Sequence, residues 1–307
     1  MTALAPSPIN LPWPLNGWLE QSVAEQLAAP GLPKLDLTRP KGEAALVPAD
    51  SISWRIFKNP VSLFIGGVSA VILELAEPRV RSGVWDHTTF RKDPLTRLRR
   101  TGAAAMITVY GARSQAEAMI GGVVRRHGHV SGVTPAGVAY NANDAVLLDW
   151  VQATASFGFI ESYSRFARRL SCADEDRAYA EAVDGAALYG AMQSPSSRAE
   201  LDAQFEQMRP HLENHTIVHE FLDIMQRAPV LPPLLKPVQK MLVRAAVDML
   251  PRWTKALLHL EDAGLNSVER SLVRRAGAFA DRVVIPNSPA AQASARLGLP
   301  ADYVYRR

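Results

Sequence analysis

The residue best placed to do chemistry is His127, at the end of an apolar helical run. Ala116, Ile120 and Val123 precede it at helical spacing, so its imidazole points the way that the buried face of that helix points. A neutral imidazole in the interior can donate a lone pair to iron or zinc when an acceptor holds its other nitrogen. A lone histidine on an apolar face is more often a hydrogen-bonded core residue, and spacing leaves both interpretations open. We prefer His127 to His129, which lies about 200° further round the helix and off the apolar face.

A basic and polar run, Arg97 to Thr101, lies upstream of His127 on another predicted helix. Arg97 and Thr101 are four positions apart and therefore share a helix face. A permanently charged guanidinium and a hydroxyl on one face could hold a polar ligand, a cofactor carboxylate or bound dioxygen. The alternative is that these arginines are ordinary surface residues that pair with acidic neighbours. Because Arg99 and Arg100 belong to the same run, at least one arginine of the run must be such a surface residue.

Asp86 and His87 lie in the short connection that leads to the Arg97 helix. Asp86 could accept a proton, and His87 could be a second polar group of a pocket. Helix caps and loop hydrogen bonds are the ordinary alternative for both residues.

Three histidines, His211, His215 and His219, recur every four residues on a predicted helix that also carries Glu213 and Glu220. Three positions along a straight helix span two turns, about 12 Å, which is more than one ion bridges, so at most two could share a metal. The chain has no His-Glu-x-x-His pattern here. We interpret the stripe as a polar helix face, with a zinc site as the alternative.

Capping patterns mark where several helices begin. Asn59-Pro60 and Asp93-Pro94 each place a capping side chain before a proline, which predicts helix starts near residues 60 and 94. Ser114-x-x-Glu117 and Ser197-x-x-Glu200 match the capping box and predict two more. The turn signal Thr134-Pro135-Ala136-Gly137 predicts a short hairpin within residues 132–142.

The second half of the chain also has a helical pattern. One helix is predicted from Asp144 to about Leu170, and Ser171 starts the next. Further helices are predicted at 198–227, 238–262, 267–281 and 289–297, and the prolines of 229–237 separate the first two because proline cannot continue a helix interior. Gly66-Gly67 and Gly121-Gly122 lie inside helical patterns and are predicted to be close-packing sites.

Composition limits the class of protein. The 307 residues, 48% of them hydrophobic, suffice for a large core. The net charge of +4 is too small to indicate nucleic-acid binding, so we expect a small-molecule partner. Cys172 is the only cysteine, which excludes an intrachain disulfide and fits a reducing compartment. The start of the chain lacks a secretory pattern and the longest apolar run, Val61 to Leu73, is too short to span a bilayer, so we expect a cytoplasmic protein.

These elements predict an all-α fold. We expect a proline-rich arm and short helix at residues 1–49, followed by one domain of about ten helices at residues 50–307, with the prolines of 229–237 as its one internal boundary. Trp13 and Trp18 of the arm are expected to pack onto the body, and a membrane or partner surface is the alternative for them.

Six short motifs, in order, resemble a bacterial family that was long catalogued as a domain of unknown function. That family is now grouped with rubber oxygenase (latex clearing protein) and the fungal oxygenase of mycophenolic acid biosynthesis. The resemblance covers roughly residues 50–280. The motifs are Asp86-His-Thr-Thr-Phe90, Asp93-Pro94 with Arg97 and Thr101, Tyr110-Gly111, His127-x-x-Val130-x-Gly132, Tyr140-Asn-Ala-Asn-Asp144 and Trp150-Val-Gln-Ala153.

The resemblance implies a helical domain that encloses haem b, with His127 as the axial ligand of the iron and dioxygen chemistry on the other side. It implies that Arg97 and Thr101 are polar pocket residues with catalytic roles. To these we add Asp86 as a catalytic candidate, and Arg97, Arg100 and His87 as candidates for contacts with the cofactor. Relatives split carbon–carbon double bonds of polyprenyl chains, so the implied function is a haem b-dependent oxygenase that uses dioxygen on an apolar alkene such as an isoprenoid. Whether the chain forms a homo-oligomer stays open.

The chain departs from the family pattern in two places. Arg100 stands where the rubber enzymes have a lysine that can cap the iron, and a guanidinium does not deprotonate, so we expect no such closed state. Gln152 stands where many relatives have a histidine after Trp-Val. The acid/base glutamate of relatives has no clear counterpart, and Asp86 and Glu74 are candidates by their nearness in sequence.

Two other functions remain open. The chain could be a haem-free helical protein of the same fold that binds lipid or a partner. It could instead be a metal enzyme that uses His211, His215 and His219 with Glu220.

Overall fold

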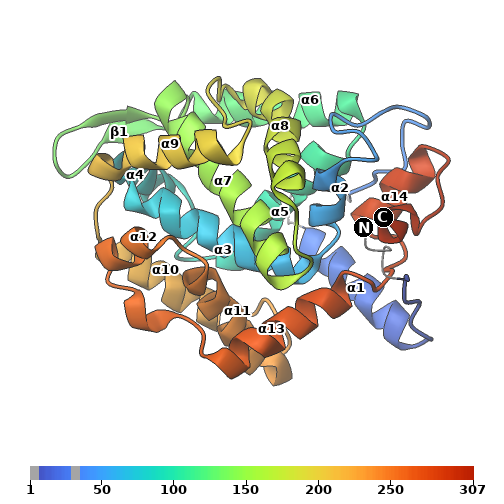
Figure 1. The fold of residues 1–307 in the computed structure, drawn as a ribbon. Coiled ribbons are helices and arrows are strands. Elements are labelled where there is room, and N and C mark those ends of the chain that lie inside the picture. Colours follow the sequence, from blue (N-terminus) through green and yellow to red (C-terminus); the bar gives the residue numbers. More distant parts are fainter. Residues whose placement is uncertain (1–6, 29–34) are drawn as a thin grey trace.

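The computed structural model describes residues 7–28 and 35–307, and these are packed helices with one small hairpin (Figure 1). The predicted all-α fold is therefore confirmed. The first half of the chain forms α1 (Leu15–Leu27), α2 (Ile52–Phe57), α3 (Pro60–Ala76), α4 (Pro78–His87), α5 (Pro94–Tyr110), α6 (Arg113–His127), β1 (Ser131–Val133) and β2 (Ala139–Asn141). The second half forms α7 (Ala145–Phe166), α8 (Cys172–Tyr189), α9 (Arg198–Met208), α10 (Thr216–Arg227), α11 (Lys236–Asp248), α12 (Arg252–Leu257), α13 (Ser267–Ala280) and α14 (Pro289–Arg296).

The helix starts that depend on a single capping side chain are confirmed. The Asn59 side chain accepts hydrogen bonds from the amides of Val61 and Ser62 at the start of α3, and Asp93 accepts one from the amide of Thr96 at the start of α5. Asp144 and Ser171 cap α7 and α8 in the same way. The hairpin is also confirmed, as an antiparallel pair of strands joined by the predicted turn.

The capping box predicted at Ser114 is wrong. Helix α6 begins at Arg113, and Gln115 reaches back to the amide of Ala112. The amide and hydroxyl of Ser114 instead donate to the Glu43 carboxylate, at 2.6 and 3.0 Å, so a distant residue competes for the serine. Ser197 does cap α9.

Two predicted long helices are each divided in two. The segment 198–227 breaks after Met208 into a 3-10 turn that contains Pro210, and α10 starts only at Thr216. The segment 238–262 breaks before Pro251, which separates α11 from α12. Both breaks follow from proline, which lacks an amide hydrogen and clashes with the preceding turn of a helix.

The centre of the fold is the contact between α3 and α7, which cross at two glycines. A Cβ atom added to Gly66 would lie 2.5 Å from the carbonyl oxygen of Gly158, so neither position has room for a side chain. Close packing at Gly66 is thus confirmed. The same prediction for Gly67 is wrong, because a Cβ atom there would meet nothing within 4 Å.

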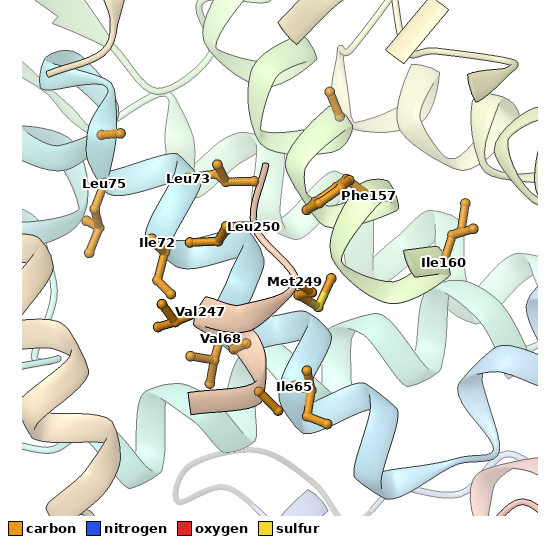
Figure 2. Close-up of a cluster of buried hydrophobic side chains, with 14 of the residues drawn as sticks. Ile65, Val68, Ile72, Leu73, Leu75, Phe157, Ile160, Val247, Met249 and Leu250 are labelled. Atoms are coloured by element: carbon orange, nitrogen blue, oxygen red, sulfur yellow. The ribbon is translucent and has the colours of Figure 1, made fainter. Parts of the chain in front are cut away.

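The hydrophobic core has two main clusters. Figure 2 shows part of the larger one, in which Ile65 and Val68 of α3, Phe157 of α7 and Met249 after α11 lie together. The second cluster joins the segment around Leu37 to α2, α5, α6 and α14. Helices α5 and α6 are therefore held mainly by the second cluster, on the other side of α3 from the contact with α11.

No single helix in the described part of the chain is long and apolar enough to cross a membrane. Helices α3 and α4, bent by 110° at the break between them, meet that criterion only when taken together.

Candidate functional site

Three polar side chains from three helices converge between the two core clusters. Arg97 of α5 lies half-buried with its guanidinium 6.0 Å from the centre of the Phe90 ring. Its charge acts both on Glu74 of α3 and on His127 of α6, since it lowers the pKa of each. The charge of Arg97 therefore acts on both His127 and Glu74, which links residues of three helices.

His127 is half-buried at the last turn of α6, while Ala116 and Ile120 on the same face are fully buried. Its Nδ1 atom is shut off from solvent and has no hydrogen-bond partner. Burial lowers the pKa of His127, and the nearby charges of Arg126 and Arg97 lower it further. The imidazole is therefore neutral at neutral pH, with a lone pair available. His129 is exposed on the turn that follows the helix.

Glu74 is the only ionisable residue in the apolar helix α3. Burial raises the pKa of its carboxyl from 4.5 to about 7, and the charge of Arg97 offsets part of that rise. Near neutral pH the carboxyl is consequently divided between its two protonation states. A group in that condition can both give and take a proton, which is the property of a general acid or base.

The face of α3 that carries Glu74 is loosely covered. Phe64, Gly67 and Val71 precede Glu74 at helical spacing and are half-buried, and there is open space where a Gly67 side chain would lie. Helix α5 packs on α1, α2, α6 and α14, and its backbone makes at most slight contact with α3. The face of α3 that leads to Glu74 is therefore open at Gly67 and only partly covered at Phe64 and Val71.

Thr101 and Arg100 are exposed on α5, one turn beyond Arg97. The Asp93 pKa is lowered mainly by its hydrogen bonds to Thr96 and in part by the charge of Arg100, which places Arg100 near the start of the helix. Further along the Arg97 face, the Thr108 hydroxyl lies 3.1 Å from that of Tyr189 in α8. Of the predicted polar face, only Arg97 turns into the space beside Glu74.

Comparison with known protein families shows which class of protein this is. The family described as "ER-bound oxygenase mpaB/B'/Rubber oxygenase, catalytic domain" matches residues 54–282. The chain belongs to this family. No curated protein and no solved structure matches it significantly. The resemblance noted above is thus confirmed, and the matched residues include Glu74, Arg97 and His127.

Family membership makes this the catalytic domain of an oxygenase, an oxidoreductase that combines a substrate with dioxygen. Its catalytic region ends at residue 282, so α14 and the last 3-10 turn lie outside it. Helix α14 nevertheless packs on α5 of the matched region, and the Arg296 guanidinium donates to the carbonyls of Glu43 and Leu37 in the segment that precedes that region.

Asp86 and His87 contact the hairpin of the oxygenase domain. Both are exposed in the last turn of α4, and the His87 Nε2 atom lies 3.1 Å from the Tyr140 hydroxyl of β2. Burial, and then the charge of Asp86, raise the pKa of Tyr140. No contact among the described residues joins Asp86 or His87 to Arg97, so Glu74 is the better placed of the two acidic candidates.

The three histidines of the alternative zinc site do not share a helix face, so that expectation is wrong. His211 lies in the 3-10 turn, and His215 caps α10 by accepting a hydrogen bond from the amide of Ile217 at 3.1 Å. His219 contacts the side-chain amide of Asn214. In residues 7–28 and 35–307 no group of three or more His, Cys, Asp and Glu side chains is arranged to hold a metal ion.

Sequence reasoning found Glu74 only as a neighbour of the other motifs. The usable signal was an acidic residue in a helix that is otherwise apolar or small, since an unpaired carboxylate is seldom buried without a function. Its partner Arg97 comes from a different helix, which no local pattern reveals.

Proposed function

We propose that this protein is a haem b-dependent oxygenase that uses dioxygen on an apolar alkene substrate such as an isoprenoid. The observation that carries the proposal is His127, a neutral imidazole with a buried, unpartnered nitrogen, placed close to Arg97. A buried polar atom without a partner costs folding free energy, about 1–3 kcal/mol, and so calls for an explanation such as a missing ligand.

The residues around His127 fit a haem. A histidine that holds iron must be neutral, and burial together with the charges of two nearby arginines lowers the pKa of His127, so His127 would hold the haem iron. A flat macrocycle needs room, and the open position in front of Gly67 supplies some of it on the α3 side. When bound, the haem supplies an iron centre that binds and activates dioxygen.

The side chains near His127 would divide the remaining work. Arg97 would donate hydrogen bonds and positive charge to a polar oxygen group, because a guanidinium keeps its charge even when partly buried. Glu74, with its pKa of about 7, would take up or release a proton next to the substrate. Phe64 and Val71 on the same face of α3 would contact the apolar part of the substrate and keep water away from it.

The remaining predicted contacts stay predictions. Thr101 is one turn from Arg97 and exposed, so it would act at the entrance of the site. Arg100 and His87 are exposed and would contact the edge of the cofactor, and Asp86 would act only if α4 moved towards Arg97.

The experiment that tests the proposal is the visible spectrum of the protein from a haem-sufficient host. We expect a Soret band in the wild type and in His129→Ala, and its loss or marked shift in His127→Ala. The His129 variant is a matched control because that histidine is exposed and only two residues away. A colourless wild-type protein that stays colourless after haem is supplied would show the proposal wrong and favour a haem-free binding protein. An unchanged spectrum of His127→Ala would remove the ligand assignment.

A second experiment addresses the substrate. Oxygen uptake by the haem-loaded protein would be followed with alkenes of increasing isoprenoid length and with the saturated analogue of each. We expect uptake only with the unsaturated compounds, and a loss of at least about tenfold in Arg97→Ala, since removing a preorganised charged donor typically costs that much or more. Equal uptake with saturated and unsaturated compounds would exclude an attack on the double bond.

A further inference from the structure

Large apolar side chains are exposed on the outer surface of α1 and α13, and none of them belongs to the candidate site. Trp13 is 86% exposed, Leu15 55% and Trp18 50%, all at the N-terminal end of α1. The expectation that the two tryptophans pack onto the body is therefore wrong. On α13, Leu272 and Phe279 are also largely exposed.

The exposed residues of α13 form one stripe. Val268, Leu272 and Phe279 are separated by four and seven positions, so they lie on a single face of the helix. The opposite face carries Val273 and Gly277, which are buried, and Gly277 packs against the backbone of Phe166 at the end of α7. Helix α13 thus buries one face and leaves a second apolar stripe without a partner.

The exposed ends of α1 and α13 are adjacent (Figure 1, lower right). Ile9 forms a β-bridge with Val283, just after α13, and the Arg282 side chain donates to the carbonyl of Ser7 at 3.1 Å. Further along, the Asn287 amide donates to Glu20 of α1. Two segments far apart in sequence are therefore fixed beside each other, and both carry exposed apolar side chains.

The α13 side of this edge carries positive charge, whereas α1 contributes two acidic residues, Glu20 and Glu25. Arg274 and Arg275 are exposed on α13, and Arg282 follows the helix. In the part of the chain that the structure describes, none of these three guanidinium groups forms an ion pair with a carboxylate, although Arg274 donates to the carbonyl of Arg165. Arg275 lies within the apolar stripe itself. The α13 side of this edge therefore fits a partner that is both apolar and anionic.

We propose that this edge is a docking surface for an anionic lipid membrane. We call it the α1–α13 edge and define it as Trp13, Leu15, Trp18, Leu272 and Phe279 with Arg274, Arg275 and Arg282. Tryptophan and phenylalanine insert into the region between headgroups and acyl chains, and arginine beside them binds lipid phosphates. Side chains that project from the outside of two helices offer no shaped pocket for a protein partner. A fluid bilayer needs none, because its lipids adapt to the side chains that enter it.

The position of the α1–α13 edge fits an apolar substrate. Helix α1 packs on α5, the helix that carries Arg97 and Thr101, so a docked membrane would lie next to the exposed end of the candidate site. This connection rests on the proposed oxygenase function. The docking itself does not, because the side chains that carry it are separate from His127 and Glu74.

The test is flotation of the purified protein with vesicles. Vesicles of phosphatidylcholine are compared with vesicles in which about one third of the lipid is phosphatidylglycerol, at low and high salt. We expect binding to the anionic vesicles, weakened by salt. Trp13→Ala with Trp18→Ala should lower the partition coefficient about tenfold or more, and Arg274→Gln with Arg275→Gln should lower it by more than about fivefold.

The matched control replaces exposed apolar residues elsewhere. Val133→Ser with Met192→Ser removes two side chains of similar exposure, 62% and 73%, from the hairpin and the loop after α8. This variant should bind like the wild type. Circular dichroism and the melting temperature of every variant show whether it folds, and quenching of wild-type tryptophan emission by brominated lipids tests insertion without any substitution.

Three outcomes would overturn the proposal. The first is no binding of the wild type to anionic vesicles, and the second is an equal loss in the control variant. The third is a wild-type dimer, seen by light scattering, that becomes a monomer when Trp13 and Trp18 are replaced and that does not bind vesicles. That result would assign the α1–α13 edge to a contact between two copies of the chain. None of these measurements uses haem, so failure of the membrane proposal can be distinguished from failure of the proposed oxygenase function.

Discussion

Replacing Glu74 with glutamine should stabilise the cofactor-free protein at neutral and basic pH. Glu74 is half-buried in an apolar helix, and burial raises the pKa of its carboxyl from 4.5 to about 7 although the charge of Arg97 opposes the rise. This difference corresponds to about 3 kcal/mol in favour of the neutral acid in the folded state. Glutamine has nearly the same shape as that acid and never ionises.

The sign of the pH dependence follows from the two pKa values. An unfolded chain loses the Glu74 proton near pH 4.5, whereas the folded chain keeps it until about pH 7. Between these values the unfolded state binds fewer protons, so the free energy of unfolding of the wild type falls as pH rises. The advantage of Glu74→Gln should grow from near zero at pH 4 to about 3 kcal/mol at pH 8.

Urea denaturation of wild type and variant at several pH values between 4 and 8.5 measures this difference. Glu117→Gln is the control, because Glu117 is an exposed residue of α6 in a surface ion pair with Arg113 and should change stability by less than about 1 kcal/mol at any pH. Stability curves of wild type and Glu74→Gln that stay parallel over the whole range would refute the reasoning. So would a variant less stable than wild type at pH 8, which would mean that pairing with Arg97 outweighs burial.

Three further predictions concern packing, a buried ion pair and the candidate ligand. Gly158→Ala should lower the free energy of unfolding by about 1–3 kcal/mol or more, because its Cβ would overlap the backbone of α3. Gly67→Ala should raise the free energy of unfolding by about 0.5–1 kcal/mol, because its Cβ would meet nothing and alanine favours a helix over glycine. Urea denaturation measures both. Asp281→Ala should destabilise by about 3–5 kcal/mol, because it leaves the buried ammonium of Lys58 without the carboxylate that now lies 2.5 Å away, and a Lys58→Met partner substitution should restore much of the loss in thermal denaturation. If His127 binds haem, acidification should remove the Soret band with a midpoint below pH 6.5, because burial lowers the pKa of this imidazole. A spectroscopic titration in which the band is lost well above pH 6.5 would contradict this.

Features that depend on a few adjacent residues were predictable from the sequence. Asn59, Asp93, Asp144 and Ser171 each accept a hydrogen bond from an amide two or three residues later, so the pattern alone locates four helix starts. The buried face of α6 followed from the spacing of Ala116 and Ile120 in the same way. The resemblance to the oxygenase family was carried by short motifs of this kind.

Features set by distant contacts were not predictable. Ser114 has the spacing of a capping box, yet Glu43 takes its amide and hydroxyl and the cap moves to Ala112. Trp13 and Trp18 were expected to be covered, because a buried tryptophan is the usual case, and nothing in the local sequence shows that α1 lies with this end on the surface. The helical pattern around Pro210 predicted one continuous helix, whereas the proline breaks the helix there.

The candidate site combines both kinds of information. His127 was found because its own helix shows which way it points, and Arg97 because it shares a helix face with Thr101 in a basic and polar run. That Glu74 joins them depends on how α3 lies relative to α5, which is a tertiary contact between residues more than twenty positions apart. Thr101 follows Arg97 on the same predicted face, but it is exposed because α5 reaches the surface within one turn.

The pair Gly66-Gly67 explains why space remains beside Glu74. Adjacent residues of a helix lie about 100° apart, so two glycines in succession leave a position without a side chain on two different faces of α3. On the Gly66 face α7 approaches until the two backbones touch, and the absence of a side chain there is used for packing. On the Gly67 face, which continues to Glu74 two turns later, no element takes up the space. A face of a central helix that is open at Gly67, lined by the half-buried Phe64 and Val71, and ends in an acid of raised pKa has the properties of one wall of a binding site.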